Sequence, residues 1–201
     1  DNSREISNTT SAVVSVFEGA TGFVLDGLKL RGQSKEQEAM GASEGRTNTL
    51  ALHCINIRET GATLRNFEAE GASIDNIYVN YTGIVDLTID NFYIGGCARN
   101  PFSLIEGYGI KMTNGVIHHS DHYGSSRDGS FKTGYVMFDC EPHAKSEHYG
   151  DIHVENVEFI NSCSSYGGHT IVLQDPDDSG VNNFKTTFKD CTLRLAVDAP
   201  E

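Results

Sequence analysis

The sequence predicts an all-β fold, namely a parallel β-helix of about six coils with loop insertions. Three observations predict it: a strand–turn–strand segment that recurs, glycines that return at intervals close to one turn of such a helix, and apolar residues that mostly alternate with polar ones. A unit that recurs every ~20 residues or more cannot bury its own apolar face, so neighbouring units must stack.

The recurring segment is an apolar strand, a glycine turn and a second strand that carries an Asn or Asp before a closing apolar pair. Its copies are Thr21–Leu28, Thr60–Phe67, Thr82–Phe92, Tyr108–Val116 and Tyr149–Phe159. The anchoring glycines are Gly22, Gly61, Gly83, Gly109 and Gly150, so successive repeats are 39, 22, 26 and 41 residues apart. The longer intervals predict loops inserted at Gln33–Asn48, Ser120–Thr133 and His143–His148. Such insertions collect on the binding face of repeat proteins.

The repeats are expected to be strands, because the apolar residues of 25–30 and 154–159 mostly alternate and lack the three-and-four spacing of helices. The predicted coils are Ala12–Gly32, Thr49–Gly71, Ala72–Gly96, Cys97–Ser120, Thr133–Ser162 and Cys163–Ala196. Residues 1–201 are therefore expected to form one β-helix domain, with a polar segment at 1–11 and coils over about 12–196. Both ends suggest a piece of a longer chain.

An asparagine recurs before the last strand of four of these coils. The four are Asn66, Asn91, Asn114 and Asn156. Asparagine tolerates the left-handed backbone conformation and bonds to neighbouring backbone, so these residues are expected to be structural.

The composition excludes several classes of function. With 15 basic and 28 acidic residues, the net charge of -13 disfavours nucleic acid as a partner. No run of about 18 apolar residues is present, so the sequence predicts neither a membrane span nor a signal peptide.

The five cysteines show no CxxC spacing, which favours buried free thiols over a zinc cluster or a disulfide framework. The sequence also has no Rossmann fingerprint, P-loop or nucleophile elbow, and we expect no cofactor.

The densest polar cluster is Phe138-Asp139-Cys140-Glu141-Pro142-His143. In an extended segment Val136, Phe138 and Cys140 face the core, whereas Met137, Asp139 and Glu141 face outward. Two crowded carboxyl groups repel, so one should have a raised pKa and stay protonated near neutral pH. One acid and one base are what glycosidic hydrolysis requires, and a separation of about 6.5 to 9.5 Å would favour inversion. Asp139, Glu141 and His143 are therefore the candidate catalytic residues.

Further polar residues are predicted to surround this pair and bind substrate. His148 belongs to the loop that Pro142 starts, and Asp175 is expected about 4.8 Å from Glu141 if the two strands stack in register. Earlier coils offer Tyr78, Asn80 and Glu106 for the same face.

The stretch Ile117–Tyr123 holds three histidines. Adjacent histidines on a strand point to opposite faces, so this stretch is interpreted as a solvated loop or a substrate contact, and no metal site is predicted. Asp121, His122 and Arg127 are candidates for one end of a sugar groove, with Arg127 able to bind a carboxylate. Tyr123 offers a ring on which a sugar could stack.

With these repeats, residues 12–195 resemble the right-handed parallel β-helix proteins of the pectin-lyase-like class, which include phage tailspikes and bacterial polysaccharide lyases and epimerases. Phe138-Asp139-Cys140-Glu141-Pro142 is similar to an Asp-x-Glu-Pro strand end found in many phage tail β-helix proteins, which bind or cut surface glycans. The resemblance implies a polysaccharide or oligosaccharide partner and an extracellular or virion location, with a secreted bacterial protein as the alternative. It also implies a homotrimer as one assembly.

A narrower resemblance links Glu141-Pro142-His143 to the Asp-Pro-His element of mannuronan C5-epimerases, which implies roles for Glu141 and His143. The tyrosine of that family falls on Phe138, which the alternation places in the core, and Glu replaces Asp. The leading expectation is therefore a surface-polysaccharide depolymerase, a glycoside hydrolase with Asp139 and Glu141 as acid and base. A lyase or uronate epimerase is the second hypothesis, and a glycan-binding or structural adhesin without catalysis is the third.

Overall fold

The computed structural model describes residues 12–17, 19–32, 53–72, 74–97, 99–119, 136–161, 170–174 and 185–195. Over these ranges the protein is all-β, as the sequence predicts, and contains no helix. None of the described residues therefore forms a helix long and apolar enough to cross a membrane. The strands are β1 (Ala12–Val16), β2 (Val24–Asp26), β3 (Lys29–Arg31), β4 (His53–Ile57), β5 (Thr63–Glu70), β6 (Ile77–Gly95), β7 (Phe102–His119), β8 (Phe138–Cys140), β9 (Tyr149–Asn161), β10 (Ile171–Leu173), β11 (Thr186–Lys189) and β12 (Thr192–Leu195).

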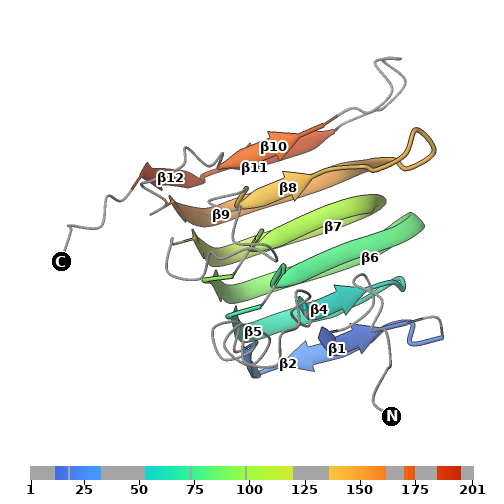
Figure 1. The fold of residues 1–201 in the computed structure, drawn as a ribbon, viewed down its shortest axis with the longest axis horizontal. Helices are drawn as coiled ribbons and strands as arrows, with labels where there is room; N and C mark the ends of the chain where they lie inside the picture. The colour runs from blue at the N-terminus through green and yellow to red at the C-terminus, as the bar shows by residue number, and fades with distance from the viewer. Residues whose placement is uncertain are drawn as a thin grey trace, which may run out of the picture.

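The strands pair in parallel and stack in chain order, from β1 at one end to β10, β11 and β12 at the other (Figure 1). One path of paired strands runs β1-β4-β6-β7-β8-β10. The long strands β6 and β7 continue beyond it, so that β5, β6, β7 and β9 form a second stretch of ladder, with β2 and β3 on β5 and with β11 and β12 on β9. This mostly parallel all-β arrangement is compatible with the predicted β-helix.

The core consists of apolar rows that run from strand to strand at matching register. One row contains Ile55, Ile77, Phe102, Phe138 and Ile171, and another contains Leu25, Leu64, Ile89, Met112, Val154 and Phe188. The rings of Phe102 and Phe138 stack with centroids 4.8 Å apart. Each fully buried side chain of this size contributes about 1.5 to 3 kcal/mol, so the rows hold successive strands together. Their alternation with outward residues confirms the predicted strand period.

The predicted structural asparagines form a continuous column. Asn66, Asn91, Asn114 and Asn156 all have left-handed backbones, with φ between 48° and 55°. The register places Gly27 and Asp190, also left-handed, at the two ends of the same column. The side chains bond along it: Asn91 donates to Asn66, and Asn156 donates to Asn114, at 2.7 and 2.8 Å. The structural role expected of these residues is confirmed.

The predicted glycine anchors are wrong at two places. The register aligns Gly22, Gly61, Asp86, Gly109 and Asp151, and all five have positive φ. Aspartate, like asparagine, tolerates the left-handed conformation, so Asp86 and Asp151 occupy the positions that the sequence analysis gave to Gly83 and Gly150. Gly83 instead lies in a segment of β6 where the ladder register shifts.

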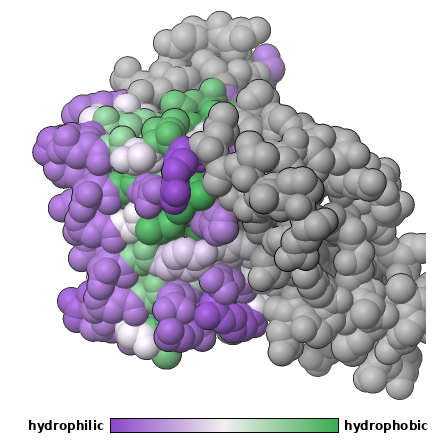
Figure 2. All heavy atoms as spheres, turned by 90° about the vertical axis from the view of Figure 1, so that its left-hand side faces the viewer, coloured by the Kyte–Doolittle hydropathy of each residue, from purple (hydrophilic) through white to green (hydrophobic). Residues whose placement is uncertain are grey.

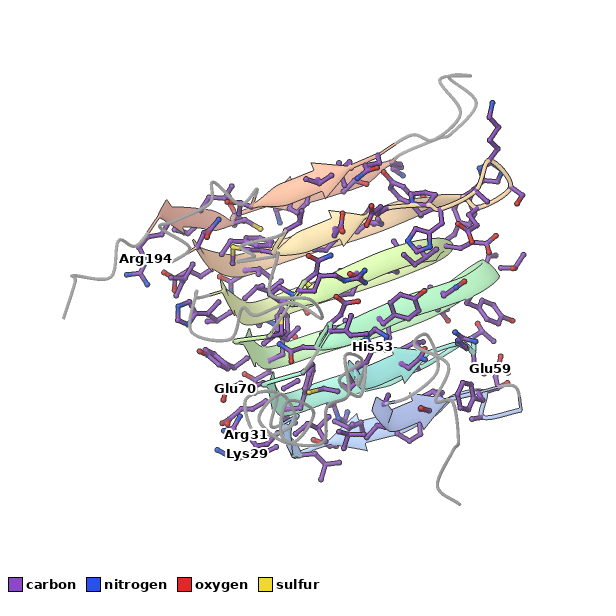
Figure 3. The ribbon with its side chains drawn as sticks, in the orientation of Figure 1. Lys29, Arg31, His53, Glu59, Glu70 and Arg194 are labelled. Atoms are coloured by element: carbon purple, nitrogen blue, oxygen red, sulfur yellow. The ribbon has the colours of Figure 1, made fainter. Side chains whose placement is uncertain are left out.

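One outward face carries ion pairs between neighbouring strands. Lys29 pairs with Glu68 and Arg31 with Glu70, both at 2.7 Å, and Arg194 pairs with Glu158 at 3.0 Å. Lys29, Arg31, Glu70 and Arg194 are labelled at the left of Figure 3, and the surface at that side is largely hydrophilic with a strip of hydrophobic residues between (Figure 2). Exposed pairs contribute little to stability, so this face is interpreted as a solvated surface.

Cys54, Cys97 and Cys140 are buried and free, as the composition predicted. Burial raises the pKa of the Cys54 thiol to about 12, so it stays protonated and unreactive. Cys191 is free and half-buried, and Cys163 lies outside the described residues. The predicted loops Gln33–Asn48 and Ser120–Thr133 also lie outside them.

Replacing Asn114, which donates to Asp90 and accepts from Asn156, tests the column. We expect Asn114→Ala to lower the free energy of unfolding by about 2 kcal/mol, because alanine is strained at positive φ and makes neither bond. Asn114→Gly should cost about half as much, since glycine avoids the strain. Urea denaturation measures both, with the exposed Lys111→Ala on the same strand as control. Equal losses for Ala and Gly would contradict a contribution from the backbone.

Candidate functional site

The short strand β8 positions the candidate acid. Phe138 and Cys140 point into the core, so Asp139 between them points to the other face. The ladder aligns Tyr78 with Ser103, and Ser103 with Asp139, so these three residues occupy one row on adjacent strands. The predicted alternation is wrong for Met137, which is fully buried in the core because it precedes the first residue of β8.

Asp139 is only 3% exposed and belongs to a buried polar network. The Asn100 amide Nδ2 donates to Asp139 Oδ2 at 2.7 Å and to Ser103 Oγ at 3.1 Å. Asn100 Oδ1 accepts a hydrogen bond from the backbone N–H of Val136 at 3.1 Å. The carboxyl group predicted to be a solvent-facing acid is thus held by an ordered side chain.

An ion pair between half-buried Arg99 and fully buried Asp75 adjoins this network. Arg99 donates to both carboxylate oxygens of Asp75, at 2.7 and 2.5 Å, and the Asn100 backbone N–H donates to Asp75 Oδ1. Asp75 has no exposed surface, and burial alone would lower the pKa of Arg99, but the charge and hydrogen bonds of Asp75 raise it. Arg99 is therefore a fixed cation beside Asp139 and Glu141, largely neutralised by Asp75.

His53 and Tyr78 cover one side of the ion pair. His53 Nδ1 lies 3.5 Å from Asp75 Oδ2, and the His53 ring stacks on Tyr78 with centroids 4.6 Å apart. Figure 3 labels His53 on β4, near the middle of the stack. Burial lowers the pKa of His53, so its imidazole is neutral at pH 7 and adds no charge to the site.

Asp139 and Glu141 form a pair of interacting carboxyl groups. Burial first, then the charge of Glu141 and a hydrogen bond with it, together raise the pKa of Asp139 to about 7. Asp139 Oδ1 is buried and receives no hydrogen bond from the N–H and O–H groups of the described residues. When Asp139 is protonated, this oxygen can donate to Glu141, so protonation of Asp139 below about pH 7 removes the unpaired buried acceptor.

The contact between the two carboxyl groups differs from the spacing considered for hydrolysis. Groups that share a hydrogen bond lie closer than the roughly 6.5 to 9.5 Å of inverting glycosidases and the roughly 5 to 5.5 Å of retaining ones. In this conformation the pair leaves no room for a water between its members. One water molecule that binds to both carboxyl groups together is compatible with their contact, as in pairs of carboxyl groups that share a proton.

The two histidines after Pro142 lie in the predicted loop between β8 and β9. His143 is exposed, and its backbone N–H donates to Glu147 Oε2, which also accepts from the Ala144 N–H at 2.9 Å. The His148 carbonyl accepts from the Gly107 N–H, and its buried Nδ1 makes no hydrogen bond to the described residues. The loop is thus closed by Glu147, and the described contacts of His143 do not involve the carboxyl pair.

Of the earlier residues, Tyr78 shares the row of Asp139, whereas Asn80 and Glu106 pair with each other further along β6 and β7. Asn80 bonds to Tyr78, and Thr82 Oγ1 donates to Glu106 Oε2 at 2.9 Å. Asn80 and Glu106 are half-buried, so both retain surface for a ligand.

Five predicted substrate contacts lie outside the described residues: Asp121, His122, Tyr123, Arg127 and Asp175. The ladder pairs Leu173 with Cys140, and the Gln174 N–H donates to the Cys140 carbonyl. Gln174, one residue before Asp175, therefore occupies the register position beside Glu141 that the sequence analysis gave to Asp175.

Five residues of this polar network were not predicted from the sequence: His53, Asp75, Arg99, Asn100 and Ser103. None lies in a recognised motif, and Asp75, Arg99 and Asn100 precede strands at positions without alternation. Asp75 and Asn100 each stand two residues before the first residue of β6 or β7, and this matching offset is the signal that could have paired them.

A separate hollow of about 590 Å³ lies over β6, β7 and β9, beside the asparagine column, and is lined by Thr88, Asp90, Lys111, Thr113, Asn114, Glu155 and Asn156. Within the described ranges, His, Cys, Asp and Glu residues do not gather in threes as a metal site requires.

Comparison with known proteins gave no match to a family model, to a curated protein or to a solved structure.

Asp139→Asn tests the protonation of the pair. Because the pKa of Asp139 is about 7 in the folded protein and its ordinary value is 3.8, the folded state binds this proton more tightly. The contribution to stability is present below about pH 4 and is lost as the pH rises through 7. Asp139→Asn, which cannot ionise, should therefore gain on the order of 2 kcal/mol over wild type between pH 5 and pH 8.

Thermal or urea unfolding at several pH values measures this difference, with the exposed Asp151→Asn as control, whose left-handed backbone asparagine tolerates. The same pH dependence for wild type and Asp139→Asn would show that Asp139 titrates normally.

Proposed function

We propose that the chain forms a right-handed parallel β-helix of about six coils that acts on a polysaccharide as a glycoside hydrolase, using Asp139 and Glu141. The fold part is supported by the six-member column of left-handed residues from Gly27 to Asp190, which is what one recurring corner per coil would produce. The strands also fall inside the six predicted coil ranges. The resemblance to tailspike-like proteins agrees with both points.

The single observation that carries the proposed reaction is the contact of Asp139 with Glu141, in which the pKa of Asp139 is raised to about 7. In the reaction, the bound sugar must first separate the two carboxyl groups, and the ionised carboxylate then takes a proton from water as the water oxygen bonds to the anomeric carbon. The bond from that carbon to the glycosidic oxygen breaks, and the protonated carboxyl group gives its proton to the departing oxygen. The pair again holds one proton at the end, so the step balances without a cofactor.

The environments of the two groups support one assignment of roles. Asp139 is buried and has the raised pKa, so it is the acid, and the half-buried Glu141 is the base that solvent can reach. Arg99 beside them favours ionisation of the pair, while Asp75 limits that effect.

A polymeric substrate is implied by the resemblance. The polar row of Asn56, Tyr78, Ser103 and Asp139 crosses β4, β6, β7 and β8, but each of these residues is at most 4% exposed, so the row itself offers no open surface to a sugar chain. An extracellular or virion location and a homotrimer belong to the same proposal and rest on the resemblance alone.

A lyase or epimerase is less well supported. Phe138 occupies the position of the tyrosine in the epimerase element, and it is fully buried against Phe102. A ring in the core cannot transfer a proton to substrate. Glycan binding without cleavage is the stronger alternative, because Asp139 at 3% exposure is held as a structural group would be.

Glu141→Gln tests the proposed base. Incubated with bacterial capsular and cell-wall polysaccharides, the wild-type protein should release new reducing ends, and Glu141→Gln should lose at least about 100-fold of this rate, as expected for removal of a general base. The matched control is Glu158→Gln, an ion-paired glutamate on the solvated face, which should cleave like wild type.

Equal rates for wild type and Glu141→Gln would exclude Glu141 from the reaction. Retained binding without reducing ends in both proteins would replace the hydrolase by a glycan-binding protein.

The rate of cleavage should fall as the pH rises through about 7. The acid must be protonated to donate, and the pKa of Asp139 is about 7 in the free protein. The pH profile of kcat/KM measures this limb. A rate that stays constant from pH 6 to 9 would contradict Asp139 as the acid.

A further inference from the structure

Asn100 holds the Asp139 carboxyl group in one orientation. The carbonyl end of the Asn100 side chain accepts from the Val136 N–H at 3.1 Å, so its amino end must face Asp139 and Ser103. From there Nδ2 donates to Asp139 Oδ2 at 2.7 Å. Asn100 is 2% exposed, so water does not compete for these bonds.

The backbone of Asn100 is hydrogen-bonded to the Arg99–Asp75 ion pair. Its N–H donates to Asp75 Oδ1 at 3.1 Å, and the Arg99 guanidinium donates two hydrogen bonds to Asp75. Asp75, Arg99 and Asn100 therefore form one connected unit that ends on Asp139.

The two oxygens of Asp139 differ as a result. Oδ2 accepts from a fixed amide, whereas Oδ1 is buried and accepts no hydrogen bond from the described residues. An amide N–H forms a stronger hydrogen bond to a carboxyl oxygen without a proton than to one that carries the proton. The proton of the pair therefore belongs on Oδ1.

We propose that Asn100 is a positioning residue that fixes the Asp139 carboxyl group with Oδ2 on the amide and Oδ1 carrying the shared proton, and that it joins the carboxyl pair to the Arg99–Asp75 ion pair. The catalytic meaning of this arrangement rests on the proposed function. The arrangement itself does not require a substrate and can be measured without one.

The charged groups around Asp139 shift its pKa in opposite directions. Glu141 and Asp75 raise the pKa of Asp139 beyond the effect of burial, and Arg99 lowers it. His53 from β4 is neutral, and Tyr78 from β6 has a pKa raised by burial, so neither contributes a charge at pH 7. The Asn100 amide stabilises the ionised form, since a carboxylate accepts a hydrogen bond more strongly than a neutral acid does.

The test is a titration of the Asp139 carboxyl carbon by NMR in the full chain labelled with carbon-13. Asn100→Ala should raise the pKa of Asp139 by about one unit, because the ionised form loses its amide donor. Asp75→Asn should lower it, because a negative charge is removed and the charge of Arg99 is no longer offset. Asp90, bonded to Thr113 and Asn114 on another part of the ladder, is the internal reference and should not move.

Opposite shifts at Asp139 with an unchanged Asp90 support the inference, because a general loss of structure would move both variants in one direction. An unchanged or lowered pKa in Asn100→Ala overturns it. If Asn100→Ala does not fold, Asn100→Ser, whose hydroxyl is too short to reach Oδ2, must give the same upward shift. If Asp75→Asn does not fold, Arg99→Gln takes its place and must raise the pKa. The expected shifts without cleavage of any glycan would remove the hydrolase proposal and leave the role of Asn100 intact.

Discussion

The parallel register between β6, β7 and β8 is the constraint on which both the core and the candidate site depend. It stacks Phe102 on Phe138 on one side of the ladder and aligns Ser103 with Asp139 on the other. Because side chains alternate along a strand, a slip of one residue would turn Asp139 into the core and Phe138 outward. The burial of the phenylalanine rings therefore also holds the carboxyl group in place.

Electrostatics explain why this polar face is ordered. Burying a carboxylate is costly unless it is paired, and Asp75 meets that condition through Arg99 and the Asn100 N–H. Arg99 is largely offset by Asp75, so Asp139 and Glu141 have no full counter-charge among the described residues, and the pKa of Asp139 is raised. This lack of positive charge lowers the stability of the fold at high pH. It also leaves one carboxyl group protonated and one ionised near neutral pH, as the proposed reaction requires.

The sequence was sufficient for those features that depend on local pattern. Alternation identified the strands, and the recurring asparagines identified one corner, because a left-handed turn restricts residue type. Alternation also placed Asp139 and Glu141 on the same face of one strand. Asp86 and Asp151 were missed because glycine is only one of the residues that tolerate positive φ. Asp75, Arg99 and Asn100 were missed because their contacts span 24 to 39 residues and depend on register, which no local pattern encodes.

A crystal structure of the Glu141→Gln variant with a bound oligosaccharide, chosen from the polysaccharide that the wild-type protein cuts or binds, tests the central claim most directly. We predict an intact sugar chain bound at the end of β8 beside the half-buried Glu141, with a glycosidic oxygen within hydrogen-bonding distance of Asp139. An oligosaccharide bound on another face, such as the hollow beside the asparagine column, with no sugar oxygen near Asp139, would contradict it.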